Sequence, residues 1–572
     1  MMKLKPFFVF PLCFIFVLSA EAQPFPQKQY PQNFFRNPLS IPIRLSGNFG
    51  ELRSNHFHMG LDIRTNQREN LPVYATADGY VSRIKIEQYG YGRAIYITHP
   101  NGFTTLYAHL NDFYPELNEH IKSVQYQQEK WEQDTVLPPG MFTVTKGQYI
   151  ANSGNTGGSG GPHLHFEIRE TYTENNLNPF PFNLGIPDKV PPFIDGLYMY
   201  DRRFSTYQGS PAAIGIKGGN GSYTSRDNVV TVNTPALSFG INAEDKTNTS
   251  FRFGIYQAEL YVDDILQNAF RMDDFSYSDS RYINAAIDYS TKAKGGHNIQ
   301  HLSRLPGNLS PVFLKTAGDG IIQLTDTEIH NVLIKVKDAA GNTTNLRFKI
   351  RLNPALVKDY MSITNSIPML PGRENELKQD NIEAHFGARA FYDTIPFLHQ
   401  SEPSLSNKIV SQVHQLHNFT VPVHDSFTVK IKAEKPLSPE EKDKVVMQVI
   451  SNRKKAAVKG IWMNDWMEAK FRDLGTFQLV IDTIAPRLLP SGWASGANLS
   501  GKNSITFLAD DDMSDLKSFR AELDGNWLMF SRKSDYFIHR FDEHTQPGNH
   551  RLKVSIMDEA GNVTERTYTF TR

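Results

Sequence analysis

Short apolar runs separated by turn-forming residues restrict the first third of this chain to a sheet fold. Asp78-Gly79 and Asn101-Gly102 are two of the separators. Because Gly, Asn and Asp tolerate the positive φ angles of tight hairpins, the pattern predicts a compact antiparallel sheet domain over residues 46–187. The apolar runs lie at 71–75, 80–86, 94–98, 104–108 and 163–168.

One segment inside this region has helical spacing instead. Neither Gly nor Pro occurs between Glu116 and Leu137, and Pro115 suits the first turn of a helix. We therefore expect a helical insertion over about 115–137, between two strands. Its apolar residues fall at helical intervals: Leu117, Ile121, Val124 and Trp131.

Two short segments far apart in the chain echo one another. Asp-Ala-Ala-Gly-Asn at 338–342 and Asp-Glu-Ala-Gly-Asn at 558–562 each stand between two strand-like runs. Gly and Asn suit the hairpin turn that this arrangement requires. The surrounding segments resemble the immunoglobulin-like β-sandwich modules of exported bacterial proteins.

The chain of 572 residues is long enough for about four domains at roughly 150 residues each. The predicted fold class is mainly β. We expect a signal segment at 1–22, a lead segment at 23–45, the sheet domain at 46–187, an immunoglobulin-like sandwich at 188–352, a linker with a third, irregular sandwich at 353–482, and a C-terminal immunoglobulin-like sandwich at 483–572.

The first 22 residues have the pattern of a secretory signal. Lys3 and Lys5 precede an apolar run at 7–18, and Ala20-Glu21-Ala22 is a small-x-small cleavage site. We expect an exported protein, in the periplasm or at the cell surface, with no transmembrane segment after cleavage. The single cysteine, Cys13, lies in the signal, so the mature chain must hold any metal with His, Asp or Glu.

Charge excludes some partners. Lys and Arg number 60, as do Asp and Glu, and removal of the signal leaves 58 basic and 59 acidic residues. This balance gives no basis for nucleic-acid binding or for attraction to an anionic wall by net charge. Any targeting must come from local surfaces.

Seven of the 18 histidines lie between His56 and His165. The pair in His163-Leu164-His165 shares one face of a strand, so one imidazole can bind a metal while the other reaches the metal-bound water. His58 and Asp62, four residues apart, offer further ligands. Two imidazoles and one carboxylate leave a tetrahedral position open, as in catalytic zinc sites. Taken singly, each pair could equally be a solvated surface pair.

Three motifs together resemble the lysostaphin-type (LytM-type) zinc endopeptidases. They are His58-Met59-Gly60-Leu61-Asp62, Tyr107-Ala108-His109-Leu110, and the glycine-rich stretch from Gly154 to Glu167. The likeness covers about residues 46–181. It implies one Zn²⁺ held by His58, Asp62 and His165, with His109 and His163 flanking the zinc-bound water; which of these two is the general base stays open.

The resemblance implies an exported zinc endopeptidase that cleaves cross-links or stem peptides of bacterial peptidoglycan. Two alternatives stay open: a catalytically silent LytM-like activator or wall-binding module, and a surface adhesion array with a vestigial enzyme domain. The immunoglobulin-like modules would bind the wall or an envelope protein partner. We also expect the helical insertion to restrict access to the cleft.

Four residues near the motifs receive plainer predictions. His56 is expected either beside the metal ligands without binding the metal or at the rim of the cleft, His99 at a strand end, and His120 in solvent on the predicted helix. Glu167 shares the strand face of His163 and His165, so it either orients a ligand or is a surface carboxylate.

Overall fold

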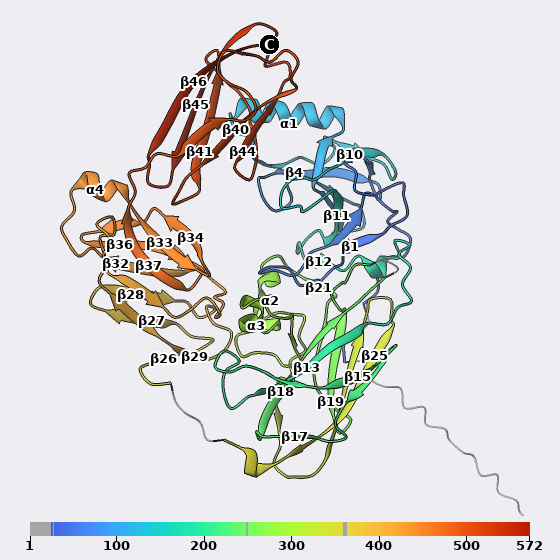
Figure 1. Cartoon of the computed structure of the whole chain (residues 1–572). Helices are drawn as coiled ribbons and strands as arrows, with labels where there is room; N and C mark the ends of the chain where they lie inside the picture. Colours follow the sequence, from blue (N-terminus) through green and yellow to red (C-terminus); the bar gives the residue numbers. More distant parts are fainter. Residues whose placement is uncertain (1–23, 27, 248–249, 359–362) are drawn as a thin grey trace, which may run out of the picture.

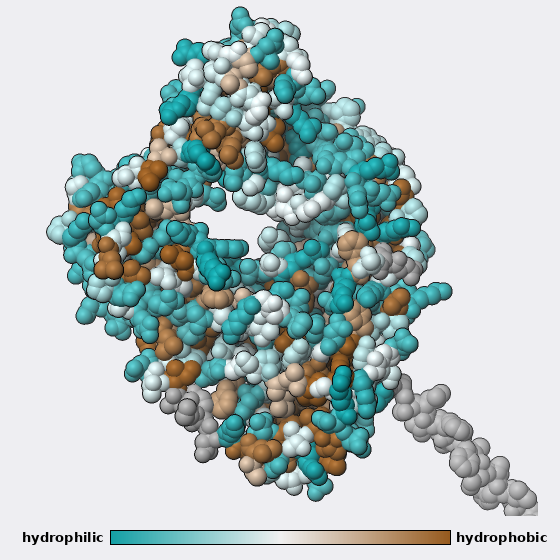
Figure 2. Space-filling model, viewed as in Figure 1, coloured by the Kyte–Doolittle hydropathy of each residue, from teal (hydrophilic) through white to brown (hydrophobic). Residues whose placement is uncertain are grey.

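The computed structural model describes residues 24–26, 28–247, 250–358 and 363–572. The expected signal segment, with Cys13, lies outside these residues. The described chain is mainly β, as predicted, and its sheet-rich units follow one another around a central opening (Figures 1 and 2). Among the described residues, no helix combines the length and apolar character needed to cross a bilayer.

The first unit contains one large antiparallel sheet and a smaller one. Leu164, Phe166 and Ile168 point from one face of β11 into the buried core of this unit, so the alternate residues of β11 occupy the other face. The large sheet has the order β1 (Leu45–Gly47), β2 (Leu61–Arg64), β11 (His163–Glu170), β6 (Phe103–Ala108), β5 (Arg93–Thr98), β4 (Gly79–Ile86), β8 (Gln133–Val136). The smaller sheet has the order β3 (Pro72–Tyr74), β10 (Tyr149–Ser153), β7 (Leu110–Phe113).

The predicted helix forms but ends earlier than expected. Helix α1 spans Pro115–Gln127 and buries Leu117 and Ile121. Residues 133–136 form strand β8 on the edge of β4 instead. The prediction of a helix to residue 137 was wrong because the free edge of β4 offers backbone hydrogen bonds that outweigh a local helical preference.

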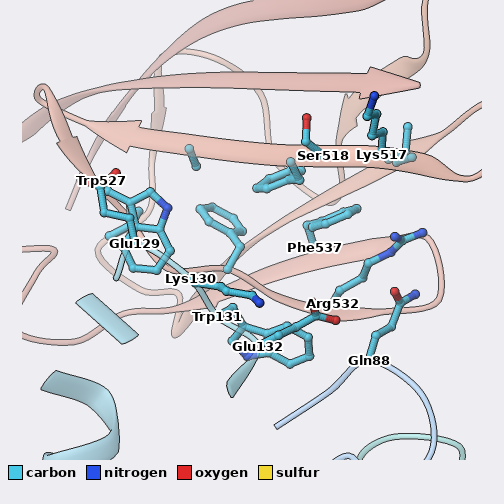
Figure 3. Close-up of a pocket in the computed structure, with 15 residues that line it drawn as sticks. Gln88, Glu129, Lys130, Trp131, Glu132, Lys517, Ser518, Trp527, Arg532 and Phe537 are labelled. Atoms are coloured by element: carbon cyan, nitrogen blue, oxygen red, sulfur yellow. The ribbon is translucent and has the colours of Figure 1, made fainter. Parts of the chain in front are cut away.

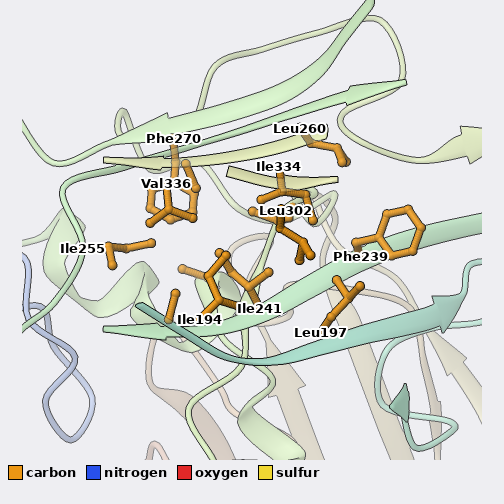
Figure 4. Close-up of a cluster of buried hydrophobic side chains, with 14 of the residues drawn as sticks. Ile194, Leu197, Phe239, Ile241, Ile255, Leu260, Phe270, Leu302, Ile334 and Val336 are labelled. Carbon is orange, nitrogen blue, oxygen red and sulfur yellow. The ribbon is translucent and has the colours of Figure 1, made fainter. Parts of the chain in front are cut away.

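The second unit is a two-sheet sandwich that shares its core with the first. Side chains from both sheets meet between them (Figure 4), and Phe49, Phe57 and Met59 of the first unit belong to the same cluster. Helices α2 (Ile283–Ala286) and α3 (Tyr289–Ala293) lie in one of its loops. One sheet has the order β14 (Ala212–Ile214), β13 (Phe193–Asp201), β18 (Ala236–Glu244), β22 (Gln300–His301). The other has the order β15 (Ile216–Gly219), β16 (Ser222–Ser225), β25 (Thr343–Leu352), β24 (His330–Lys337), β19 (Gln257–Val262), β20 (Ile265–Arg271).

The junction between the first two units is a continuous sheet. Strand β12 (Asn176–Leu177) pairs with β11 on one side and with β21 (Asp274–Phe275) of the second unit on the other. The Phe275 ring lies 4.6 Å from that of Phe49 and 5.5 Å from that of Phe57. The second unit therefore supports the first directly and does not merely follow it in the chain.

The third unit is again a pair of sheets around one core. Helix α4 (Pro439–Lys444) is a single short helix held by a capping box between Ser438 and Glu441. One sheet of this unit has the order β27 (Asn375–Gln379), β28 (Ile382–Phe386), β32 (Phe427–Lys432), β36 (Trp466–Phe471), β35 (Ile461–Met463). The other has the order β30 (His399–Glu402), β31 (Val413–Leu416), β37 (Gly475–Ile481), β33 (Val445–Ser451), β34 (Lys454–Val458).

The fourth unit is also a sandwich, and it returns to the first unit. One of its sheets has the order β38 (Arg487–Pro490), β40 (Ser504–Asp510), β44 (Tyr536–Arg540), β43 (Ser531–Lys533). The other has the order β39 (Ala497–Asn498), β46 (Val563–Thr571), β45 (Asn549–Asp558), β41 (Leu516–Leu523), β42 (Asn526–Trp527). In Figure 1 this unit lies beside α1. The two echoing segments of the sequence form the turns between β24 and β25 and between β45 and β46, as expected.

Side chains of α1 close the arrangement. Lys122 Nζ lies 2.5 Å from an Asp542 oxygen and 2.7 Å from a Glu543 oxygen, and the Tyr126 ring stacks on that of His544 with centroids 3.6 Å apart. A pocket remains beside this contact, between Trp131 and residues of the fourth unit (Figure 3). The side of α1 that faces away from the core of the first unit therefore packs against the C-terminal sandwich.

Candidate metal centre

Strand register brings the predicted ligands together. In the antiparallel pair β2 and β11, Asp62 stands directly opposite His165. On the other side of β11, His165 pairs with Ala108, so His109 follows at the end of β6. His58 lies three residues before β2, in a segment whose neighbours Phe57 and Met59 are buried. Residues about 100 apart in sequence thus meet because of sheet pairing.

Three ligand atoms form a tight triangle. His58 Nε2 lies 3.0 Å from Asp62 Oδ1 and 3.1 Å from His165 Nδ1, and His165 Nδ1 lies 3.0 Å from Asp62 Oδ1. All three residues are buried, with 5–7% of their surface exposed. Ligands of a tetrahedral zinc ion at 2.0–2.1 Å would lie about 3.3 Å apart, close to these separations.

Hydrogen bonds on the far side of each ring determine which nitrogen is free. His58 Nδ1 lies 2.7 Å from the Asn48 carbonyl, and His165 Nε2 lies 2.8 Å from a Glu167 carboxylate oxygen. Because these oxygens only accept, each ring donates its hydrogen outward. When both rings are neutral, the two remaining nitrogens direct lone pairs at one another and at Asp62. Such a set of acceptors fits a bound cation, and its N and O donors suit zinc.

His109 and His163 flank this triangle. Their ring centroids are 4.6 Å apart, and His163 Nε2 lies 3.3 Å from Asp62 Oδ1. His109 Nδ1 donates to the Thr156 carbonyl and His163 Nδ1 to the Gly161 carbonyl, both at 2.8 Å. The Nε2 atom of each ring is therefore left to exchange a proton.

The backbone at His109 is held in an uncommon conformation. Its φ angle is 60°, in the left-handed region, where β6 ends and β7 begins. Its amide donates to the Tyr91 carbonyl at 2.9 Å. A non-glycine residue here costs on the order of 1–2 kcal/mol, and such positions concentrate at functional sites.

Burial keeps His109 neutral. Desolvation, aided by the nearby His165 and His163, lowers the pKa of His109 to about 3. Burial alone would also lower the pKa of His165, but its hydrogen bonds to Asp62 and Glu167 raise it to about 9. A cation beside Asp62 would displace that proton, since a histidine ligand must be neutral.

Glu167 fixes the orientation of His165. It is fully buried, and its Oε1 accepts from His165 Nε2 and from the Tyr91 hydroxyl, both at 2.8 Å. Oε2 accepts from Arg169 Nε at 2.8 Å and Asn176 Nδ2 at 2.6 Å. Although burial opposes ionisation, Arg169 and His165 lower the pKa of Glu167 to about 2. Glu167 therefore holds the ring of His165, the predicted ligand, in place; the alternative of a surface carboxylate is wrong.

Several members of this network received no role from the sequence. Arg169 continues the alternation of His165 and Glu167 along β11, which is the one available signal. Tyr91, in the turn between β4 and β5, likewise had no predicted role. Arg53 donates from Nη2 to Asp62 Oδ2 at 2.8 Å, and neither spacing nor motif indicates it.

The remaining histidines near the motifs lie outside the triangle. His56 is exposed, and its Nδ1 bonds to the Ser54 carbonyl. His99 is buried, and its ring bonds to the Asp78 carbonyl and the Thr105 hydroxyl. His120 was expected in solvent, but it is half-buried, with its ring centroid 5.4 Å from that of Phe142.

The glycine-rich loop packs closely against the turn between β4 and β5. A Cβ at Gly157 would lie 2.3 Å from the Gly92 amide nitrogen, and one at Gly92 would lie 2.4 Å from the Thr156 hydroxyl. Both residues also have positive φ angles. Only glycine fits these positions, and the contact places the Thr156 carbonyl where it accepts from His109.

Comparison with known families agrees with this geometry. Residues 56–126 and 141–179 match the model of peptidase family M23, and residues 368–482 match that of a Zu5-like domain. The second match corresponds to the third unit, which the sequence predicted only as an irregular sandwich.

Individual relatives match about a quarter of this chain. An uncharacterized metalloprotease of Haemophilus influenzae is 33% identical over 143 residues, which are 24% of this chain and 25% of that protein. A DD-carboxypeptidase/endopeptidase, Mpg, of Neisseria meningitidis is 34% identical over 134 residues, 23% of this chain and 25% of that protein. The chain thus spans about a quarter of the length of these curated relatives.

Among solved structures, a zinc-containing peptidase from Vibrio cholerae is 28% identical. The match covers 24% of this chain and 37% of that one, with a TM-score of 0.18.

Proposed function

We propose that this chain, whose residues 56–126 and 141–179 match the model of peptidase family M23, is an exported zinc endopeptidase that cleaves peptides of bacterial peptidoglycan. One observation carries the proposal: the ligand atoms of His58, Asp62 and His165 face one another in a buried triangle, and the imidazoles of His109 and His163 lie beside it. The names of relatives, among them a peptidoglycan DD-endopeptidase, ShyC, of Vibrio cholerae, support the substrate class.

His58, Asp62 and His165 would hold the zinc ion, with Arg53 and Glu167 holding Asp62 and His165 in place. When bound, zinc supplies Lewis-acid chemistry: it polarises the scissile carbonyl and lowers the pKa of water to about 7.

The proton transfers fall to the flanking pair. Because Nδ1 of His109 and of His163 is committed to a backbone carbonyl, Nε2 of either ring can take a proton from the attacking water and deliver it to the leaving amine. The low pKa of His109 keeps it unprotonated before the reaction, and the positively polarised edge of the other ring can stabilise the developing oxyanion.

The substrate must reach a site whose surroundings include the C-terminal sandwich. Lys533 Nζ of that sandwich lies 3.5 Å from the carbonyl of Asn155, next to the Thr156 that holds His109. Gln88, in the turn between β4 and β5, bonds to the Ser534 carbonyl at 3.3 Å. We infer that this sandwich, more directly than α1, limits which peptidoglycan fragments enter. Removing residues 483–572 and comparing large with small cross-linked fragments tests this, and an unchanged preference refutes it.

The central test uses the purified mature protein with purified peptidoglycan, mass analysis of the fragments, and metal content of the same samples. We expect one zinc per chain and release of peptide fragments. His165→Ala should lose both zinc and activity, whereas His109→Ala should keep zinc and lose activity. His56→Ala, which changes an exposed neighbour, serves as the matched control and should behave as the wild type.

The same experiment separates the alternatives. A zinc-loaded protein that releases nothing would contradict the enzyme and favour an activator or a wall-binding module. A His109→Ala variant as active as the wild type would contradict the role of the flanking pair. Export is tested by the N-terminal sequence of the mature protein, which should begin at Gln23, and by cell fractionation. Protein partners of the sandwiches are tested by pull-down with residues 190–572.

A further inference from the structure

Two groups of three aspartates lie at matching places in the second and fourth units. We call Asp188, Asp245 and Asp338 the first triad, and Asp482, Asp511 and Asp558 the second triad. In each triad, one ligand oxygen from every residue lies within 4.8 Å of the other two. Neither triad is part of the metal centre described above.

The two triads occupy the same positions of the sandwich topology. Asp188 and Asp482 each lie five residues before the first strand of their unit, β13 or β38. Asp245 and Asp511 each come directly after the strand that pairs with it, β18 or β40.

The third members, Asp338 and Asp558, are the aspartates of the two echoing turns. In each turn an asparagine four residues after the aspartate, Asn342 or Asn562, bonds to both carboxylate oxygens. It donates its backbone N–H to one oxygen and its side-chain N–H to the other, at 2.7–2.9 Å. The aspartates at the other corner also match, since Asp188 accepts from the Val190 amide and Asp482 from the Ile484 amide.

Each triad contains a buried carboxylate oxygen without a partner. Asp245 is 4% exposed and its Oδ1 has no hydrogen bond; Asp482 is 1% exposed and its Oδ2 has none. Asp511 Oδ1 is likewise buried and unpaired. Within the described part of the chain, no Lys, Arg or His nitrogen forms an ion pair with any of the six carboxylates. Buried polar atoms in native proteins almost always have a partner, so these oxygens point to a missing one.

Electrostatics agrees with this conclusion. Burial, together with Asp188 and Asp338, raises the pKa of Asp245 to about 8. Burial, Asp511 and Asp558 raise the pKa of Asp482 in the same way. Three carboxylates in a desolvated corner repel one another unless a proton or a cation neutralises them.

We propose that each triad binds one divalent cation of the calcium type, so that the chain carries two such sites in addition to the zinc site. The donors are carboxylate oxygens only, which hard cations prefer and which zinc sites with histidine do not resemble. Calcium–oxygen distances of 2.3–2.6 Å allow ligands on opposite sides of the ion to be about 5 Å apart, which accommodates the observed separations. Waters and backbone carbonyls would complete the coordination.

The location gives the sites a mechanical role. Asp188 lies in the connection from the first unit to the second, and Asp482 in the connection from the third to the fourth. A cation in each triad ties that connection to two loops of the following sandwich. Calcium would therefore stiffen two joints of the arrangement that brings the fourth unit back to α1 (Figure 1).

Calcium binding to the full mature chain tests the proposal. The zinc-loaded protein is dialysed against resin-treated buffer and titrated with Ca²⁺, and separately with Mg²⁺, in a calorimeter. We expect two calcium ions per chain for the wild type, one for Asp245→Asn, one for Asp511→Asn and none for the double variant. Asp264→Asn and Asp535→Asn, exposed aspartates of the same units, are matched controls that keep both sites.

Thermal unfolding supplies a second readout. Calcium should raise the melting temperature of the wild type but not of the double variant. In calcium-free buffer each Asp→Asn change should raise the melting temperature or leave it unchanged, because it removes repulsion. A folded variant with a lower melting temperature there that still binds two calcium ions would show a purely structural carboxylate and overturn the proposal. So would absence of saturable calcium binding at Ca²⁺ concentrations about ten times the weak end of extracellular sites, which is about 1 mM, binding of Mg²⁺ alone, or two sites in the double variant. If Asp245→Asn fails to fold, Asp188→Asn at the half-buried corner tests the same site. None of these outcomes depends on peptidase activity.

Discussion

Replacing Glu167 by glutamine tests whether the buried carboxylate positions the metal ligand. The side chain keeps its shape, but one of its four donors, His165, Tyr91, Arg169 or Asn176, must then face an amide N–H. Loss of a hydrogen-bond partner behind a metal ligand typically lowers metal affinity about 10- to 100-fold. That corresponds to about 1.4–2.7 kcal/mol. The change also leaves the buried Arg169 without its carboxylate, which costs about 3–5 kcal/mol of unfolding free energy.

Two measurements follow for Glu167→Gln. Zinc affinity is determined by competition with a chromophoric chelator, and stability by urea unfolding at a fixed zinc concentration. Glu170→Gln, on the same strand but exposed, is the matched control and should change neither. A folded Glu167→Gln variant with the zinc affinity of the wild type would refute the positioning role.

Three further perturbations address the other units. Phe275→Ala should lower the unfolding free energy by about 3–5 kcal/mol and weaken zinc binding, because this buried ring supports the segment around His58. A variant that loses stability but keeps its zinc affinity would contradict the dependence of zinc binding on the second unit. Lys122→Glu should break the contact of α1 with Asp542 and enlarge the radius of gyration in small-angle X-ray scattering, whereas Lys470→Glu should not. Acidification should destabilise the third unit, because burial lowers the pKa of three histidines to about 4 while the unfolded chain takes up protons below about pH 6.5. The unfolded state then binds more protons, so stability falls as the pH drops from 6.5 to 4. Urea unfolding at pH 7 and pH 5 measures the unfolding free energy at each pH. Substitution by glutamine should reduce the difference between the two values; the three histidines are His414, His417 and His424.

The sequence alone predicted strands β3, β4, β5, β6 and β11 of the first unit and proposed the residues of its candidate metal centre. Strand alternation has a period of two residues, so His163, His165 and Glu167 had to share a face. Spacing could not choose between a ligand and a surface carboxylate for Glu167, because burial depends on what packs over the strand. The end of α1 was missed for a related reason: residues 133–136 become a strand only because β4 offers a free edge.

Tertiary structure alone decided the long-range partners. Arg53 reaches Asp62 through a loop that no periodicity describes, and the core beneath His58 is completed by Phe275 of the next unit. The carboxylate triads join residues as much as 150 positions apart, of which the sequence indicated only the turn aspartates, Asp338 and Asp558. Local patterns report the preferences of neighbouring residues, whereas burial, charge neutralisation and metal geometry depend on which distant strands pair and on which sandwiches pack together.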